Sequence, residues 1–173
     1  DKHIDIALFS AGGSISKEFA PIFAQNHTIV VDNSSCWRTD KEVPLIVPEV
    51  NSDDIKQHKN IIANPNCSTI QSVVPLKPLH DLYQIKRIVF STYQAVSGAG
   101  RAGCQDLENG MKGLPPAKFP QPIVSNCLPH IDVFLDNGYT KEEEKMIFET
   151  KKILKDQNIK ITATTVRVPL WTQ

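Results

Sequence analysis

The first 65 residues alternate short apolar runs with turn residues, and this order restricts the fold more than any other feature of the sequence. HIDIALFSAGGSISKEFAPIF reads as a strand, a glycine turn and a helix, HTIVVDNSS as a second strand and turn, and NIIAN as a third strand. VPLIVPEV predicts a short extended segment between prolines. Strands that alternate with helices are typical of βαβ units, so we expect an α/β fold with a parallel sheet in this part.

The remaining residues predict a different order of elements. IKRIVFSTYQ and IKITATTVRVPLW read as strands, and GRAGCQDLENGMKG reads as a helix between glycines. Before that helix, a helical pattern follows residue 67, and we expect Pro75 and Pro78 to kink or shorten it. A proline-rich segment, residues 114–138, is predicted to lack regular structure and to wrap a surface or an interface. The helix from residue 140 opens with a capping box of Thr140 and Glu143.

Composition excludes several classes of function. Nineteen basic residues balance nineteen acidic residues in 173, so we expect no nucleic-acid partner. The dense charge run, Lys141 to Lys145, is typical of a solvated helix face. The four cysteines have no metal-ligand spacing, and we predict no metal site and reduced thiols. The sequence has no apolar stretch near twenty residues, which predicts a cytoplasmic protein without a membrane partner.

Cys67 is the residue with the clearest chemical potential. The Asn64-Pro65-Asn66 turn ends an apolar run, and Ile70, Val73 and Val74 then recur at helical spacing. Asn66 is placed to cap that helix, so Cys67 is expected in its first turn, where unpaired backbone N–H groups favour the thiolate. A nucleophile and a buried packing residue both remain open on this evidence, because free cysteines are often buried.

Eight ordered blocks carry a resemblance to a known family. They are LFSAGGSIS, VVDNSSCWR, VPLIVPEVN, ANPNCSTIQ, STYQAVSGAG, LPHID, EEEKMIFETKKIL and VRVP. Together they span about residues 4 to 169, and their order and spacing resemble aspartate-semialdehyde dehydrogenase, in its non-enteric bacterial branch. Proteins of that family are about twice as long and begin with a glycine-rich dinucleotide fingerprint that these residues do not contain.

The resemblance implies a fold and a reaction. The fold is α/β plus α+β: a partial Rossmann-like parallel sheet in residues 1–65, then a mixed-sheet catalytic and dimerisation domain in residues 66–173, which forms a homodimer. The reaction is the NADP-dependent reductive dephosphorylation of L-aspartyl-4-phosphate to L-aspartate 4-semialdehyde, in lysine, threonine and methionine biosynthesis. In the family, the cysteine that matches Cys67 forms the thioester intermediate.

The resemblance also assigns roles to individual residues. Gln94 matches the residue that orients the acyl group. The other matched residues bind phosphate (Arg38, Asn66 and Lys145), hold the amino acid (Glu142 and Arg167), or line the nicotinamide end of NADP (Ser10, Gly12, Gly13, Asn33 and Asn64). Without the resemblance, Arg167 reads as a surface strand residue, and the Glu142 to Lys145 run as a solvated helix face.

Two departures from the family limit the expected activity. The family's acid–base histidine would fall at position 174, after Gln173, and the glycine fingerprint is missing. We therefore expect a fragment that folds in large part but does not turn over by itself. Two alternatives remain: a structural and dimerisation module without catalysis, and a sister enzyme such as N-acetyl-γ-glutamyl-phosphate reductase.

Overall fold

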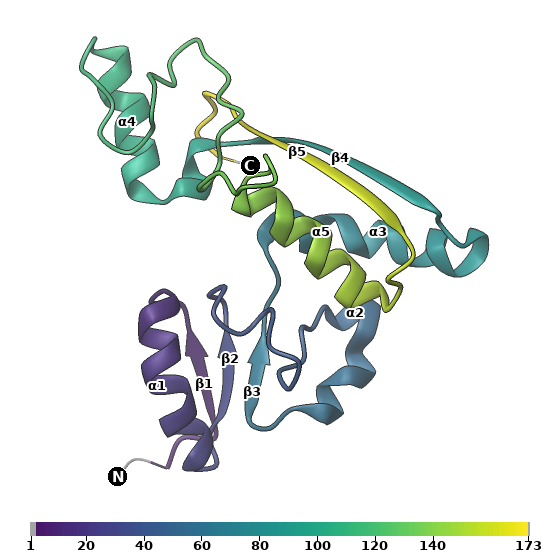
Figure 1. Ribbon diagram of the computed structural model, residues 1–173. Helices are drawn as coiled ribbons and strands as arrows, with labels where there is room; N and C mark the ends of the chain where they lie inside the picture. The colour runs from purple at the N-terminus through teal and green to yellow at the C-terminus, as the bar shows by residue number, and fades with distance from the viewer. Residues whose placement is uncertain (1–2, 173) are drawn as a thin grey trace. The chain divides into compact units, whose positions relative to one another are not determined.

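A three-stranded parallel sheet forms the N-terminal part of the computed structural model, which describes residues 3–172. Its strands are β1 (Ile6–Phe9), β2 (Ile29–Asp32) and β3 (Ile61–Ala63), in that order across the sheet. Ile6 lies opposite Ile29, and Val30 lies opposite Ile61. Helix α1 (Gly13–Gln25) joins β1 to β2 and packs beside them (Figure 1). The predicted βαβ arrangement is therefore confirmed.

The segment between β2 and β3 is only partly extended. Leu45 forms an isolated parallel bridge with Ala63, as an extended segment would. A short helix, α2 (Pro48–Asn51), then begins at Pro48 and is followed by a 3-10 helix, η1 (Ser52–Gln57). Proline has a fixed φ and no N–H, which suits the first turn of a helix. The prediction of an extended segment was therefore wrong from Pro48 onward.

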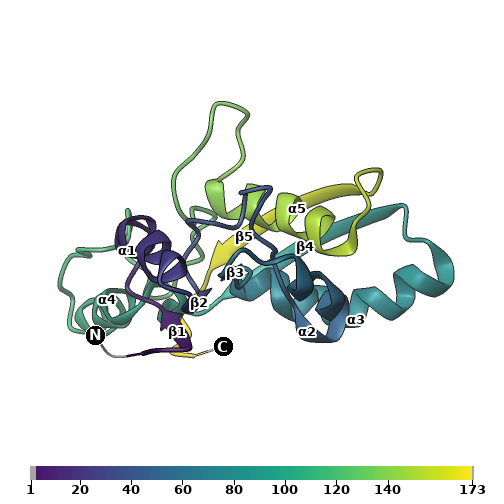
Figure 2. The same ribbon diagram turned by 90° about the horizontal axis from the view of Figure 1, so that it is seen from below.

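Helix α3 (Cys67–Tyr83) runs through Pro75 and Pro78, so the expectation that they shorten the helix was wrong, and a kink stays a prediction. It ends where Gln84 takes a left-handed conformation (φ 52°). Figure 2 shows α2 beside α3, and the two helices are in contact. Buried apolar side chains form the core around these elements, including Val30, Leu45, Val47, Ala63, Val73 and Ile153.

The second sheet pairs β4 (Arg87–Gln94) with β5 (Lys160–Arg167). The two strands run in the same direction, because Lys160 N–H donates to the Lys86 carbonyl and Val168 N–H donates to the Gln94 carbonyl. Leu128 adds an antiparallel bridge to Arg167, which makes the pairing mixed. In the sequence, β4 is followed by η2 (Val96–Ala99), α4 (Arg101–Met111) and α5 (Lys141–Leu154), and then by β5. The predicted fold class, α/β followed by α+β, is confirmed.

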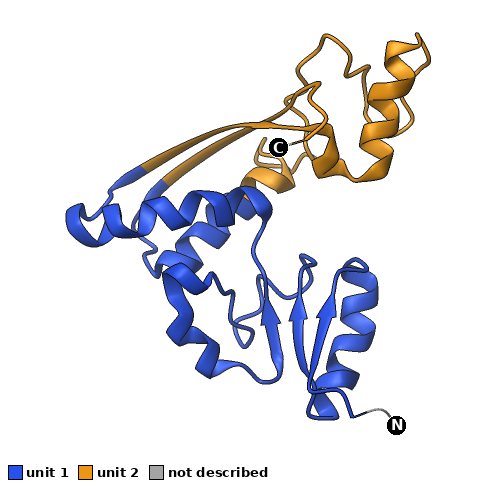
Figure 3. Cartoon of the chain, turned by 180° about the vertical axis from the view of Figure 1, so that it is seen from behind, with its two compact units in different colours: residues 1–87, 145–160 blue, residues 88–144, 161–173 orange. Residues whose placement is uncertain are grey.

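The chain divides into two compact units (Figure 3), residues 1–87 with 145–160 and residues 88–144 with 161–173. The first unit thus includes α3 and the later part of α5, and the division into domains at residue 65 stays a prediction. In the structure's described part, residues 3–172, no helix is both long and apolar enough to cross a membrane.

Asp106, on α4, anchors the proline-rich segment of the second unit. Its carboxylate accepts the backbone N–H groups of Ala117, Lys118 and Phe119 at 2.9, 2.7 and 2.8 Å. Burial acts to raise the pKa of Asp106, but these three donors and the Lys118 charge outweigh it and hold the pKa below its usual value. An irregular segment is therefore fixed by one carboxylate rather than by repeating secondary structure.

Candidate active site

Three of the predicted cofactor residues lie together at the carboxyl edge of the parallel sheet. Ser10 follows β1, Asn33 follows β2 and Asn64 follows β3. The Asn64 side-chain amide donates to Asn33 Oδ1 at 2.8 Å, and the Asn33 amide lies 3.4 Å from Ser10 Oγ. Since ligands of open parallel sheets bind outside the carboxyl ends of the strands, this row of polar groups is in the expected place for one.

Gly12 and Gly13 shape the start of α1 at the same edge. Gly12 is the N-cap residue with φ 93° and ψ 165°, a conformation that favours glycine. A Cβ added at Gly12 would meet nothing within 4 Å, so the loop is open on that side. Backbone N–H groups at a helix N-terminus attract anions and polar ligands, and this suits the role predicted for the two glycines.

Cys67 is the first residue of α3 and is exposed. Asn66 caps the helix as predicted: its Oδ1 accepts the N–H groups of Ser68 at 2.9 Å and Thr69 at 3.3 Å. The prediction of a cysteine in the first turn of a capped helix is confirmed. Because Cys67 is exposed, the alternative that it is a buried packing residue is wrong.

Arg38 is buried in the first unit and has one charged partner. Its Nη1 lies 3.2 Å from Glu149 Oε1, and its Nη2 donates to the Asn33 carbonyl at 3.0 Å. The other Glu149 oxygen accepts the Asn66 N–H at 2.7 Å. Burial raises the pKa of Glu149, opposed by the Arg38 charge and the Asn66 N–H. One carboxylate thus joins two predicted phosphate-binding residues.

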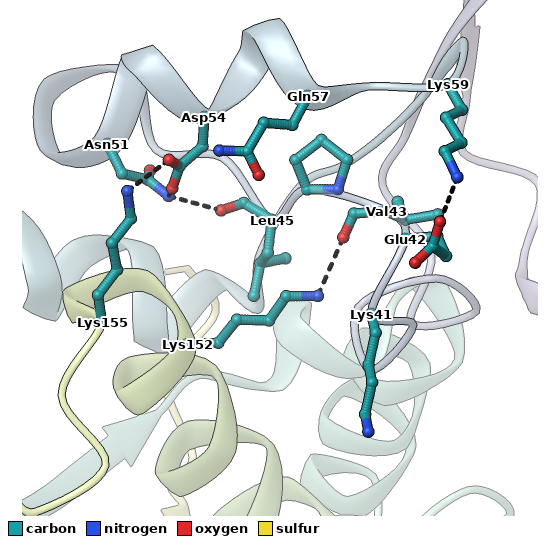
Figure 4. Close-up of a pocket in the computed structure, with 11 residues that line it drawn as sticks. Lys41, Glu42, Val43, Leu45, Asn51, Asp54, Gln57, Lys59, Lys152 and Lys155 are labelled. Carbon is teal, nitrogen blue, oxygen red and sulfur yellow. Dashed lines mark hydrogen bonds and ion pairs between the residues drawn. The ribbon is translucent and has the colours of Figure 1, made fainter.

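Lys152 holds the loop that carries Arg38. Its ammonium group donates to three backbone carbonyls, those of Arg38 at 2.9 Å, Asp40 at 2.7 Å and Val43 at 3.0 Å. Burial lowers the pKa of Lys152, and the charges of Asp40 and Glu149 oppose this. Figure 4 shows its side chain reaching the Val43 carbonyl beside a pocket of about 480 Å³. Lys152 is therefore a structural clamp for this loop.

The other charged residues of this pocket are largely paired with one another. Lys59 bonds to Glu42 and Lys155 bonds to Asp54 (Figure 4). Asn51 donates to the Leu45 carbonyl at 2.9 Å and accepts the Val47 N–H at 2.8 Å. We assign the pocket no chemistry, because these bonds support the loop itself.

In the second unit, the structure brings together Gln94, Glu142 and Arg167. The Gln94 side-chain amide donates to Glu142 Oε1 at 3.3 Å, and both side chains are buried. Arg167 Nη1 donates to the Ala95 carbonyl, next to Gln94 in the chain, at 2.7 Å. Arg167 is 6% exposed, so its interpretation as a surface strand residue was wrong.

Part of the first turn of α5 is buried, against the expectation of a solvated face. Glu142 and Glu143 are each 8% exposed. The capping box is confirmed, since Thr140 N–H donates to Glu143 Oε2 at 2.7 Å and Glu143 N–H donates to Thr140 Oγ at 3.3 Å. The second oxygen of Glu143 accepts the Thr165 N–H of β5 at 2.9 Å. Glu143 therefore links the helix to the sheet, whereas Lys141 in the same run is exposed.

The other three cysteines differ from Cys67 in their surroundings. Cys36 and Cys104 are half-buried, and Cys127 is exposed. Burial, followed by the nearby Asp32 charge, raises the pKa of the Cys36 thiol, which disfavours its thiolate. Cys127 follows Asn126 in an irregular segment rather than at a helix start.

Sequence reasoning missed Glu149 and Gly98. Glu149 lies three residues after Met146 and four before Ile153, so it falls within the buried stripe of α5, which was a usable signal. A Cβ at Gly98 would lie 2.7 Å from Arg167 Nη1. Glycine therefore leaves the space that the guanidinium group occupies, and no sequence pattern indicated this.

Comparison with known families agrees with this arrangement. Residues 76–172 match the family described as "Semialdehyde dehydrogenase, dimerisation domain", and residues 1–58 match "Semialdehyde dehydrogenase, NAD binding domain". The first match covers more than half of the chain. The chain belongs to the semialdehyde dehydrogenase family.

Within that family, the individual relatives that resemble this chain are aspartate-semialdehyde dehydrogenases. The aspartate-semialdehyde dehydrogenase of Aquifex aeolicus is 60% identical over 98% of this chain and 53% of its own length. That of Campylobacter jejuni is 51% identical over 96% of this chain and 51% of its own length. The chain thus spans about half the length of these relatives. The resemblance inferred from the eight sequence blocks is confirmed.

Two solved structures show the same fold. Aspartate semialdehyde dehydrogenase II from Vibrio cholerae, complexed with ASA, superimposes with a TM-score of 0.92 at 51% identity, over 96% of this chain and 52% of that one. The Candida albicans enzyme with NADP gives 0.69 at 27% identity, over 96% of this chain and 47% of that one.

Proposed function

We propose that this chain supplies the nucleophile, and residues for the phosphate, substrate and cofactor sites, of an NADP-dependent aspartate-semialdehyde dehydrogenase. The reaction is the reduction of L-aspartyl-4-phosphate to L-aspartate 4-semialdehyde with release of phosphate. The observation that carries the proposal is an exposed cysteine, Cys67, at the capped start of α3. Family membership and the names of the relatives support it, and they favour this enzyme over N-acetyl-γ-glutamyl-phosphate reductase.

The first chemical step is acyl transfer to Cys67. The thiolate attacks the acyl carbon of the substrate, the C–O bond to phosphate breaks, and a thioester and inorganic phosphate form. Cys67 is exposed at the start of α3, so its sulfur is accessible to the acyl carbon. Arg38, Asn66 and Lys145 bind the phosphate, since a guanidinium fork and an ammonium charge both suit its oxygens.

Reduction of the thioester completes the reaction. Bound NADP in its reduced form would supply the hydride for the acyl carbon. Cys67 is the leaving group of this reduction: its carbon–sulfur bond breaks, and it departs as thiolate with the aldehyde as product. Gln94 orients the acyl group with a neutral amide, which can hydrogen-bond the acyl oxygen without adding charge. Glu142 and Arg167 hold the ammonium and carboxylate ends of the amino acid, and both lie in the same unit as Gln94.

The residues at the carboxyl edge of the parallel sheet fit the nicotinamide half of NADP. Ser10, Asn33 and Asn64 form a hydrogen-bonded row there, and the loop before α1 is open at Gly12, where an added Cβ would meet nothing within 4 Å. We also propose that the protein acts as a homodimer in the cytoplasm. The match of residues 76–172 to a dimerisation domain supports the dimer, and four free thiols are typical of a reducing compartment.

The test compares two exposed cysteines in the complete gene product. Consumption of NADPH in the presence of L-aspartyl-4-phosphate is measured for the parent and for Cys67→Ser and Cys127→Ser. We expect Cys67→Ser to lose activity to the detection limit, because a hydroxyl is a far weaker nucleophile than a thiolate, and Cys127→Ser to keep it. An active Cys67→Ser, or a parent without activity on this substrate, would contradict the proposal.

A further inference from the structure

Glu149 contacts two parts of the first unit that the proposed function uses together. Its Oε1 lies 3.2 Å from Arg38 Nη1, and its Oε2 accepts the Asn66 N–H at 2.7 Å. Glu149 is 1% exposed. Because each oxygen has a different partner, the carboxylate lies between the Arg38 loop and the start of α3.

We propose that Glu149 is a positioning residue for phosphate binding beside Cys67. It fixes the Arg38 guanidinium group relative to Asn66, so that the guanidinium group and the Asn66 side-chain amide bind the same anion. This inference rests on the proposed function, which assigns phosphate binding to Arg38 and Asn66. It adds a residue that acts on the anion only through these two.

The contacts of Arg38 show how its orientation is set. Glu149 holds Nη1, and the carbonyl of Asn33 accepts from Nη2 at 3.0 Å. Two partners on different nitrogens prevent the planar guanidinium group from rotating. A guanidinium group has five N–H donors, and among residues 3–172 only these two partners accept from that of Arg38. The group therefore keeps donors for an anion while it is held in place.

Asn66 is fixed from two sides as well. Its backbone N–H donates to Glu149, and its side-chain oxygen accepts from Ser68 and Thr69. The residue is 6% exposed, so neither bond is replaced by water without a rearrangement of the helix start. A change at Glu149 is consequently transmitted to the residue that directly precedes Cys67.

If Glu149 only neutralised the Arg38 charge, its loss would have the opposite effect on phosphate binding. A buried carboxylate near a phosphate repels it, and loss of that charge alone would leave Arg38 more attractive to anions and tighten phosphate binding. If Glu149 positions the two groups, loss of either bond weakens phosphate binding instead. The sign of the change therefore separates the two roles.

The experiment measures protection of Cys67 by inorganic phosphate. The chain is alkylated with iodoacetamide at increasing phosphate concentration, with chloride keeping the ionic strength constant, and the modification of Cys67 is followed by peptide mass mapping. Glu149→Gln places an amide donor against Arg38 or against the Asn66 N–H. Glu149→Asp keeps the charge but is too short to reach both. We expect each variant to raise the half-protecting phosphate concentration at least about tenfold.

The control is Glu18→Gln, which removes the same charge from an exposed position on α1. In this variant, phosphate should half-protect Cys67 at the same concentration as in the parent. Circular dichroism confirms that each variant is folded, and Glu149→Asp decides the question if Glu149→Gln does not fold. The inference would be overturned if Cys67 of Glu149→Asp were half-protected at the same phosphate concentration as in the parent, or at a lower one. A parent in which phosphate does not protect Cys67 would contradict the proposed phosphate site itself.

Discussion

Two buried carboxylates on α5, Glu143 in its first turn and Glu149 in its third, are held in different ways. Glu143 bonds to Thr140, three residues away, and to one strand residue, Thr165. Glu149 bonds to Arg38 and Asn66, which are 111 and 83 residues away in sequence. The first carboxylate mainly completes local structure, whereas the second connects distant parts of a compact unit.

Two carboxylates that are similarly buried do not contribute equally to the free energy of unfolding. Neutral N–H donors surround Glu143, while Glu149 also neutralises a buried guanidinium group. Loss of one partner from a buried ion pair leaves the other charge without compensation, and this is far more destabilising than loss of a helix cap.

The largest effect is expected from Glu149→Leu. It leaves Arg38 buried without its charged partner, and we expect the free energy of unfolding, measured with urea, to fall by about 3–5 kcal/mol. The double variant Arg38→Met with Glu149→Leu should recover much of this loss, because no charge remains buried. A double variant as unstable as the single one would show that the ion pair is not the cause.

A smaller effect is expected at the first turn of α5. Thr140→Ala removes the hydroxyl that accepts the Glu143 N–H, so the free energy of unfolding should fall by about 0.5–2 kcal/mol. Thr39→Ala, at an exposed position outside the helices, serves as the matched control and should change stability by less than about 0.5 kcal/mol. If Thr140→Ala were as destabilising as Glu149→Leu, the two regions would not differ as argued.

The smallest effect is a dependence on pH. Burial raises the pKa of Glu149 above the ordinary value of 4.5, against the opposing influence of Arg38. Its protonation therefore adds stability that is fully present below pH 4.5 and is lost as the pH rises through the raised pKa. Glu149→Gln lacks this titration. The unfolding free energy of the parent minus that of Glu149→Gln should rise as the pH is lowered through this window, and a difference that falls would contradict the direction of the shift.

Local features of this molecule could be predicted from the sequence. Three of these features each depend on residues within a few positions of one another: the strands of the parallel sheet, the Asn66 cap before Cys67 and the Thr140–Glu143 capping box. Their physical causes, apolar periodicity and capping chemistry, are visible in any short window of sequence. The roles of Gln94, Glu142 and Arg167 came instead from the family resemblance.

The features that sequence reasoning missed depend on partners far along the chain. Glu149 lies at a position of the buried stripe of α5, but its contacts with Arg38 and Asn66, far along the chain, are what compensate the buried charge. The full length of the helix through Pro75 and Pro78 was not expected either, because tertiary packing overrides an unfavourable local propensity.

The assignment of Cys67 as the nucleophile is tested most directly by comparing the alkylation rates of Cys67 and Cys127 in the folded chain. Both thiols are exposed, so accessibility does not separate them, but only Cys67 lies at a capped helix start. With limiting iodoacetamide near neutral pH and peptide mass mapping, we expect Cys67 to react first, as the nucleophile of the proposed reaction should. Faster modification of Cys127, or of the half-buried Cys36 or Cys104, would contradict the assignment of Cys67 as the activated nucleophile.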